Sequence, residues 1–318
     1  MPEPAMMRIA MVGAGGIARR HLGVLVNEPE VVIAAHTGGG SDSANENARV
    51  YGGSAYPDVG SMLEAERIDA AWVCVPPGSH GEIERALIAR EIPFLVEKPL
   101  AADDDSPQVL AKEIAASGLP VAVGYHFRAL DTLDELRQTL AANRPQMVIG
   151  AWHGSMPGVP WWRKQALSGG QTVEQATHLF DLARFLLGEA AVEAALAKHP
   201  PEPVLPGADV AGVSAALLRF VDGVPGSFTS TCLLAVSTPA HLQLVSEGLL
   251  VTVTQQAVTY ERAGERREVR TGTDPFMVEN RAFLEAVRTG NDTGILSKYA
   301  DALQTHRLCC AVRAAAGG

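Results

Sequence analysis

Two short stretches of the sequence carry residue types that suit acid–base chemistry. The first is Glu97-Lys98-Pro99, which follows the short apolar run Phe94–Val96. The second is a helical stretch led by Gly169-Gly170, in which Glu174 and His178 stand four residues apart. A lysine and a histidine can both transfer protons once their surroundings tune them. Lys98, Glu174 and His178 are therefore candidate catalytic residues, although a Glu–His pair at this spacing is more often an ordinary solvated contact.

A glycine-rich turn near the start of the chain has the pattern of a dinucleotide-binding loop. The apolar run Ile9–Val12 leads into Gly13-Ala14-Gly15-Gly16-Ile17-Ala18 and then into a helical segment. The first glycine of such a loop permits the tight turn, and the second lets the backbone approach a pyrophosphate. We expect the phosphates to rest on the helix N-terminus, at Gly13, Gly15, Gly16 and Ile17. The alternative is an ordinary strand-to-helix turn in an unrelated α/β protein.

The first 125 residues alternate between strand and helix. Nearly continuous apolar runs predict buried strands at Arg8–Val12, Val31–Ala35, Ala70–Val75, Phe94–Val96 and Val121–Gly124. Helices are expected between them, at Gly16–Asn27, Ser43–Tyr51, His80–Arg90 and Ser106–Ser117. This alternation predicts an α/β fold that opens with a Rossmann-type, doubly wound parallel sheet. Ligands of such sheets bind outside the carboxyl ends of the strands, so Lys98 is expected in the cofactor crevice.

After residue 125 the pattern changes to clustered strands. A helix at Leu130–Ala142 and a strand at Met147–Trp152 precede a helical segment between residues 170 and 187. Antiparallel strands are then expected at Ala191–His199, Val210–Phe220, Gly226–Cys232, His241–Ser246, Leu249–Thr254 and Ala257–Arg262, with closing helices at Pro275–Thr289 and Ser297–Ala314. We therefore expect a dinucleotide-binding domain at residues 1–125. Residues 126–318 are expected to form an α+β domain with a large, mostly antiparallel open sheet, which binds substrate and mediates oligomerisation.

Composition excludes several classes of partner. The formal net charge of −10 argues against nucleic acid and anionic membranes, and no apolar run is long enough for a membrane span. The start of the chain lacks the pattern of a signal peptide, so we expect a cytoplasmic protein. The four cysteines form no C-x-x-C pair, and no Cys/His group has zinc spacing, so no metal site is expected.

The second strand gives only a weak indication of the cofactor. It ends at His36-Thr37, without the carboxylate that normally binds the ribose 2′-hydroxyl of NAD, and the nearest acid is Asp42. Thr37 and Ser41 are able to donate hydrogen bonds to a 2′-phosphate, but no arginine or lysine is near. We therefore expect either NAD or NADP, with a slight preference for NADP.

Five motifs together resemble the Gfo/Idh/MocA oxidoreductases, the group of glucose–fructose oxidoreductase and inositol dehydrogenase. They are the glycine turn, the Pro76-Pro77-x-x-His80 segment, Glu97-Lys98-Pro99, Trp162-Arg163, and the helix after Gly169-Gly170 with His178 and Asp181. The resemblance implies that Pro76, Pro77, His80, Glu97 and Lys98 contact the cofactor. It also implies that Lys98, Trp162, Arg163, Glu174 and His178 contact substrate, with Lys98 and His178 as the acid/base pair and a cis Lys98-Pro99 bond.

The resemblance predicts an NAD(P)-dependent dehydrogenase or reductase. Its substrate would be a secondary alcohol or ketone of a sugar, polyol or cyclitol, and the protein would be a homodimer or homotetramer. One departure is that many members have aspartate and glycine four and two residues before the histidine, where this chain has Glu174 and Ala176. Two alternatives stay open. One is a member that uses tightly bound NAD transiently, for example to cleave a glycosidic bond, and the other is a dinucleotide-binding sensor without catalysis.

Overall fold

A computed structural model describes residues 6–38, 41–200 and 206–317, and the side chain of Ser41 lies outside the described part. The glycines expected at positions 39 and 40 of the cofactor loop also fall outside it. The chain divides into two compact units. The first comprises Met1–Ala101, Asp105–His126 and Pro275–Leu303, and the second comprises Ala102–Asp104, Phe127–Asp274 and Gln304–Gly318. In the described ranges, no helix has the length and apolar character needed to cross a membrane.

The first unit is built on a six-stranded parallel sheet with the order β3-β2-β1-β4-β5-β6. Its strands are β1 (Met7–Val12), β2 (Val31–Thr37), β3 (Ser54–Tyr56), β4 (Ala70–Val73), β5 (Phe94–Val96) and β6 (Val121–Val123). The helices between them are α1 (Gly16–Leu25), α2 (Ser41–Tyr51), α3 (Val59–Ala65), α4 (Glu82–Ala89) and α5 (Asp105–Ser117). Every residue of β4 and β5 is buried, as apolar strands covered on both faces must be.

Both faces of this sheet carry a hydrophobic core. On one face, side chains of α3, α4 and α5 pack on the strands, for example Met62, Leu87 and Leu110. On the other face, α1 and the late helix α10 (Pro275–Thr289) pack together through residues such as Leu22 and Phe283. Trp72 meets Phe283 edge-on at 5.1 Å. The segment that contains α10 thus completes the first unit, whereas it was predicted from the sequence to be part of the domain at residues 126–318.

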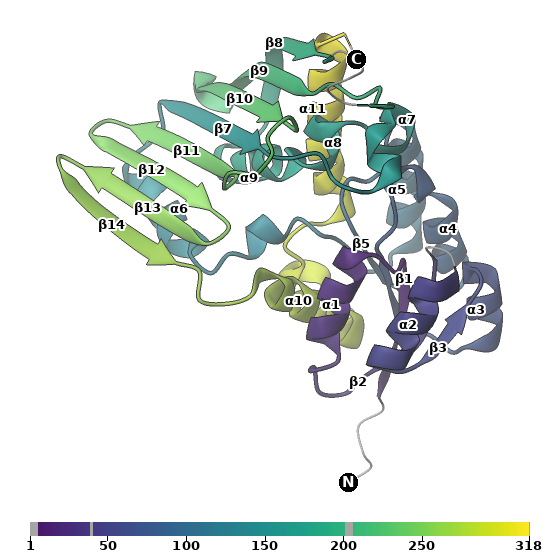
Figure 1. The fold of residues 1–318 in the computed structure, drawn as a ribbon. Helices are drawn as coiled ribbons and strands as arrows, with labels where there is room; N and C mark the ends of the chain where they lie inside the picture. Colours follow the sequence, from purple (N-terminus) through teal and green to yellow (C-terminus); the bar gives the residue numbers. More distant parts are fainter. Residues whose placement is uncertain (1–5, 39–40, 201–205, 318) are drawn as a thin grey trace. The chain divides into compact units, whose positions relative to one another are not determined.

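The second unit is built on an eight-stranded sheet with the order β14-β13-β12-β11-β7-β10-β9-β8. Its strands are β7 (Met147–His153), β8 (Ala190–Lys198), β9 (Val213–Phe220), β10 (Pro225–Thr231), β11 (His241–Ser246), β12 (Leu249–Thr254), β13 (Ala257–Arg262) and β14 (Glu265–Arg270). All neighbours pair antiparallel except β7 and β10, which run parallel. Figure 1 shows these strands side by side, from β14 at the left to β8 at the top.

One face of the large sheet is covered by helices. These are α6 (Leu133–Ala142), α9 (Thr177–Leu187) and the second half of α11 (Tyr299–Ala315), with the short helices α7 (Gln165–Ser168) and α8 (Gln171–Glu174) nearby in the chain. Phe180 of α9 stacks on Phe228 of β10 with ring centroids 4.5 Å apart. Along strands such as β9 and β10, buried side chains on this face alternate with more exposed side chains on the opposite face, as expected for a sheet covered on one side.

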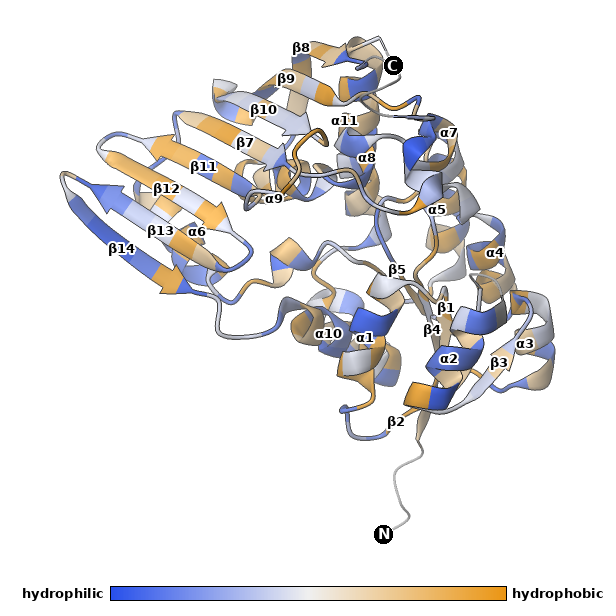
Figure 2. Cartoon of the chain, in the orientation of Figure 1, coloured by the Kyte–Doolittle hydropathy of each residue, from blue (hydrophilic) through white to orange (hydrophobic). Residues whose placement is uncertain are grey.

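The fold class predicted from the sequence is confirmed, and the differences are local. Strands β3 and β14 and helix α3 were not predicted from the sequence. Strand β14 consists of Glu265-Arg266-Arg267-Glu268-Val269-Arg270 and is the hydrophilic edge of the sheet in Figure 2. Its charges suit an edge strand, where they discourage pairing with other chains.

The prediction of one helix between residues 170 and 187 was wrong, because the chain turns at Gln175–Ala176 between α8 and α9.

Candidate active site

The carboxyl ends of the parallel strands bring the motifs of the first unit to one edge of the sheet. Backbone hydrogen bonds link the chain just past each strand to its neighbour. Gly13 N–H donates to Thr37 O at 2.8 Å, and Glu97 N–H donates to Val73 O at 2.8 Å. The sequence order of the strands reverses between β1 and β4, which is the position where open α/β sheets bind ligands.

The glycine turn fits a bound pyrophosphate. Gly13 has a φ of +109°, and a Cβ there would lie 2.0 Å from the Cys74 carbonyl oxygen, so only glycine is tolerated. A Cβ at Gly15 or Gly16 would meet nothing within 4 Å, so the protein itself leaves that space open. Gly15 caps α1 without a side chain, and its neighbours Gly16 and Ile17 are exposed. The first helical amides therefore face open space that a phosphate group can occupy.

The end of β2 offers a hydroxyl to the cofactor. Thr37 is buried, and its Oγ1 has no hydrogen-bond partner. A buried hydroxyl without a partner costs free energy, which a ligand acceptor would recover. Ser41 begins α2, and Asp42 lies in the first turn of that helix with its side chain exposed. The residues present therefore fit either dinucleotide.

The Pro76–His80 segment holds its histidine turned inward. Pro77 begins a 3₁₀ turn, Pro77–Ser79, and His80 follows with its side chain only 3% exposed. His80 Nδ1 lies 2.6 Å from Glu84 Oε1, while Glu84 Oε2 accepts from Gly81 N–H. Burial would raise the pKa of Glu84, but the hydrogen bond and charge of His80 outweigh it and leave that pKa below its ordinary value. His80 is thus fixed by α4, and its Nε2 is buried without a hydrogen-bond partner.

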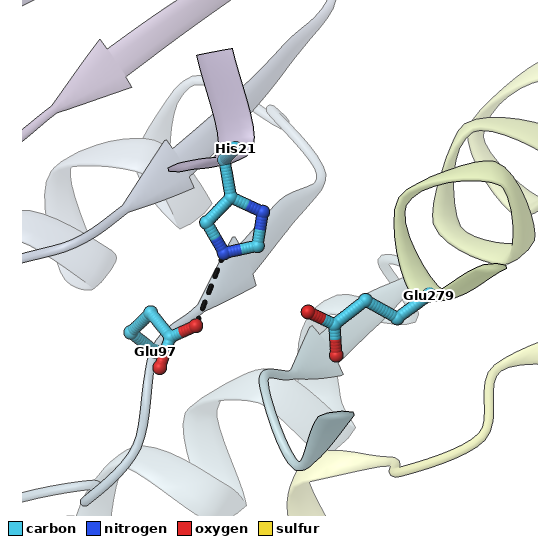
Figure 3. Close-up of side chains that lie close together, drawn as sticks. All are labelled: His21, Glu97 and Glu279. Carbon is cyan, nitrogen blue, oxygen red and sulfur yellow. Dashed lines mark hydrogen bonds and ion pairs between the residues drawn. The ribbon is translucent and has the colours of Figure 1, made fainter. Parts of the chain in front are cut away.

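Glu97 and Lys98 follow β5, and the Lys98-Pro99 bond is cis, which confirms that prediction. Glu97 is buried, and its Oε2 accepts from the Lys98 backbone N–H at 3.1 Å. Its Oε1 lies 3.0 Å from His21 Nε2, and Glu279 of α10 lies beside this pair (Figure 3). Neither His21 nor Glu279 was predicted from the sequence, because neither stands in a motif.

In the second unit, Glu174 ends α8 and is held by Trp162. The Trp162 indole N–H donates to Glu174 Oε2 at 2.7 Å, and the Trp162 side chain is fully buried. Because α8 and α9 are separate helices, Glu174 and His178 do not have the i, i+4 relation of one continuous helix. Arg163, also expected at the substrate, donates from Nη1 to the Pro206 carbonyl oxygen at 2.9 Å.

His178 lies in the first turn of α9 among aromatic rings. It is 3% exposed, and its ring stacks on Phe127 at 5.1 Å and on Trp152 at 5.9 Å. Flat apolar rings on an imidazole restrict its orientation and exclude water from it. The structure therefore brings Trp162 to Glu174, and it surrounds His178 with aromatic side chains.

Asp181, which shares α9 with His178, belongs to a buried ion pair. Arg128 donates to both carboxylate oxygens of Asp181, at 2.7 and 2.6 Å, and Thr305 Oγ1 donates to Oδ1 at 2.8 Å. Burial, only partly offset by Arg128, raises the pKa of Asp181. The pair fixes the helix that carries His178.

Comparisons with known proteins agree with the dinucleotide-binding fold. Residues 7–125 match the model of an oxidoreductase family with an NAD-binding Rossmann fold, and residues 132–263 match the model of the GFO/IDH/MocA C-terminal domain. The chain belongs to the Gfo/Idh/MocA oxidoreductase family. The family, the enzyme class and the NAD(P) cofactor predicted from the sequence are thereby confirmed.

Several family members and solved structures are similar to the chain. It is 31% identical over 209 residues to inositol 2-dehydrogenase 4 of Saccharopolyspora erythraea, a match that spans 61% of this chain and 57% of that protein. Its fold is similar to KijD10, a 3-ketoreductase from Actinomadura kijaniata in complex with NADP and TDP-benzene, with a TM-score of 0.86, 21% identity and 97% of each chain covered. It is also similar to GenD2 from gentamicin A biosynthesis in complex with NAD, with a TM-score of 0.85, 21% identity, and 99% of this chain and 95% of that chain covered.

The buried ion pair beneath His178 gives a stability prediction. Arg128→Met should remove the cation that donates to both oxygens of the buried Asp181 carboxylate, and we expect a loss of about 3–5 kcal/mol in the free energy of unfolding. The matched control is Arg137→Met, because Arg137 is exposed and lies over the same Phe185 ring as Arg128. That change should cost only about 0.5–1 kcal/mol. Urea unfolding measures both, and equal losses would contradict a special role for the buried pair.

Proposed function

We propose that this protein is an NAD(P)-dependent dehydrogenase or reductase acting on a secondary alcohol or ketone of a sugar, polyol or cyclitol. The single observation that carries the proposal is the position of Glu97-Lys98 at the carboxyl edge of the sheet that also bears the open glycine turn. The relative from S. erythraea is named an inositol dehydrogenase, and KijD10 is named a ketoreductase. Residues 1–125 are proposed to bind the dinucleotide, and residues 126–318 to bind substrate.

The cofactor is proposed to contact Gly13, Gly15, Gly16 and Ile17 through the turn and the α1 amides. Thr37, Ser41, Pro76, Pro77, His80, Glu97 and Lys98 complete the proposed contacts. When bound, the nicotinamide supplies or accepts the hydride. The protein's own residues orient the two reactants and move the proton.

Lys98 is proposed to hydrogen-bond the reacting oxygen, since an ammonium group stabilises negative charge that develops there. Its backbone is fixed by Glu97, which supports an accurate position of the side chain. His178 is proposed to accept or return the proton, and its stacking on aromatic rings supports a fixed orientation. Glu174 is proposed to bind a substrate hydroxyl, with Trp162 as its anchor and Arg163 nearby in the chain.

Two rival functions make different measurable predictions. A member that uses bound NAD transiently would keep its cofactor through purification and show no net change in nicotinamide absorbance during turnover. A sensor would bind the dinucleotide and show no turnover with any polyol or sugar. Binding alone requires neither Lys98 nor His178, so their presence favours an enzyme over a sensor. A panel of polyols, sugars and cyclitols, assayed with both cofactors, distinguishes the three.

The two proposed acid/base residues should be separable from cofactor binding. Lys98→Ala and His178→Ala should each slow turnover by roughly 10²–10⁴-fold while dinucleotide binding stays nearly intact, because each removes a proton-transfer group. Lys112→Ala and His241→Ala, which change the same residue types elsewhere, serve as controls. Steady-state kinetics and fluorescence titration of the reduced cofactor measure the two effects. Near-normal turnover in either variant would remove that residue from the proposed mechanism.

The hydroxyl of Thr37 should contribute to cofactor choice. We expect both cofactors to bind, with NADP preferred by a modest factor. Thr37→Val keeps the shape and removes the hydroxyl, so NADP binding should weaken by roughly 10- to 100-fold, the value of one hydrogen bond to a charged group. NAD binding should change little. Calorimetric titration of each cofactor measures this preference, and NAD binding ten times more tightly than NADP to the unaltered protein would refute it.

The uncovered face of the large sheet supports a homodimer or homotetramer. Leu196 of β8 is 76% exposed and Leu217 of β9 is 54% exposed, and their register places them on the same face. Apolar side chains gathered in this way favour burial against a second subunit. Leu196→Glu and Leu217→Glu should each lower the oligomer mass, because a buried charge disfavours the interface. Val109→Glu on α5 is the control, and light scattering that shows a monomer before any change would contradict the proposal.

A further inference from the structure

A buried polar cluster lies next to Lys98 in the first unit. It consists of His21 on α1, Trp72 in β4, Glu97 after β5, and Asn280 on α10. The side chain of His21 is 0% exposed and that of Glu97 is 6% exposed. Buried charges persist only where they are paired and hydrogen-bonded, so the position of each proton in this cluster is constrained.

Trp72 fixes which atom of Asn280 faces the cluster. The Trp72 indole N–H donates to Asn280 Oδ1 at 2.9 Å, and His21 Nδ1 lies 2.8 Å from the same atom. An indole nitrogen is a donor only, so its partner must be the amide oxygen and not the amide nitrogen. That oxygen cannot donate, and His21 Nδ1 must therefore carry a hydrogen.

The second ring nitrogen of His21 then has one favourable arrangement. His21 Nε2 lies 3.0 Å from Glu97 Oε1. With a hydrogen already on Nδ1, a neutral imidazole would present a lone pair to an ionised carboxylate, and two acceptors at this distance repel. A proton between Nε2 and Oε1 removes the repulsion. Asn280 and Trp72 thus impose a shared proton on the His21–Glu97 pair.

Glu97 connects this pair to Lys98. Its Oε2 accepts from the Lys98 backbone N–H, and a Cβ at Gly124 would lie 2.5 Å from Oε1, so glycine makes room for the carboxylate. Burial would raise the pKa of Glu97, but the hydrogen bond and charge of His21, with the charge of Lys98, hold the pKa below its ordinary value. The carboxylate is ionised and is held at a defined place.

Other titratable groups lie near the His21–Glu97 pair, and they do not supply the proton that the pair shares. Burial lowers the pKa of His126 to about 4, and it raises the pKa of the Cys74 thiol well above its ordinary value, so both are uncharged near neutral pH. One carboxylate oxygen of Glu279, one of Glu97 and one ring nitrogen of His21 lie within 4.8 Å of one another. The charge of Lys98 acts on both Glu97 and His126, the charge of Arg20 acts on His126, and the charge of Glu279 acts on Cys74.

We propose that His21 is a positioning residue for Lys98: it shares a proton with Glu97, keeps that carboxylate ionised, and so fixes the backbone from which the Lys98 side chain extends. The role of Lys98 rests on the proposed function. The shared proton does not, because it follows from the geometry of His21, Trp72, Glu97 and Asn280.

The shared proton is tested first, on the unaltered protein. Protein labelled with ¹⁵N-histidine should show N–H signals on both ring nitrogens of His21 at pH 7, assigned by their loss in His21→Gln. The same signals should persist in Lys98→Ala, whatever that variant does to turnover. A single N–H on His21 would overturn the proposal. So would one tightly bound divalent ion per chain in the purified protein, because the ion would occupy the place of the proton.

Kinetics test the link to Lys98. Without His21, burial raises the pKa of the Glu97 carboxylate. In His21→Gln, Glu97 should therefore take up a proton at a higher pH than in the unaltered protein. The acidic limb of kcat/KM should then shift upward by at least one pH unit, with kcat lowered at least tenfold and dinucleotide affinity within about threefold. The double change His21→Gln with Glu97→Gln removes both ionisable groups and should abolish the shift.

The control for this series is His241→Gln, which should leave the pH profile unchanged. A merely structural role would lower the melting temperature without moving the acidic limb. Therefore a His21→Gln enzyme with an unshifted pH profile would overturn the positioning role, even if the N–H signals are present. If Lys98→Ala retained full turnover, the proposed function would fail, while the NMR result on His21 would stand separately.

Discussion

The amide oxygen of Asn280 is the contact on which the interior of the first unit depends. It accepts from Trp72 in the central strand β4 and lies within hydrogen-bond distance of His21 on α1. Through it, a helix from late in the chain is joined to a sheet formed early in it. Without this oxygen, buried donors of Trp72 and His21 would have no partner, and each such loss costs about 1–3 kcal/mol. Apolar packing of Phe283 on Trp72 fixes the same helix in place.

Each unit places a buried charge pair beside a candidate catalytic residue, and the two pairs are stabilised differently. Glu97 has His21 at one carboxylate oxygen and the Lys98 backbone amide at the other, so the pKa of Glu97 stays low in spite of burial. Asp181 is held on both oxygens by Arg128, yet burial dominates and its pKa is raised. Fixed pairs of this kind resist reorientation, which accurate positioning of a proton-transfer group requires.

The sequence predicted the parts of the fold that depend on local patterns. Apolar runs identified five of the six parallel strands, and the glycine turn and Glu97-Lys98-Pro99 follow the strands that they were expected to follow. Strand β14 escaped detection because five of its six residues are charged, so it lacks the alternation of apolar and polar residues that marks a half-buried strand. The return of α10 to the first unit could not be predicted, because no local pattern records which sheet a helix will cover. His21 was missed for the same reason, since its partners are 76 and 259 residues away.

The break between α8 and α9 changes how the side chain of Glu174 is positioned. On a continuous helix, a glutamate at this position would simply reach one methylene further than an aspartate along the face that carries His178. Here Glu174 ends α8, and its Oε2 is fixed by an indole that is itself fully buried. Trp162 therefore limits where the extra methylene can direct the carboxylate. In the proposed function, the position of a substrate hydroxyl that binds Glu174 would be set by Trp162 as much as by the helix.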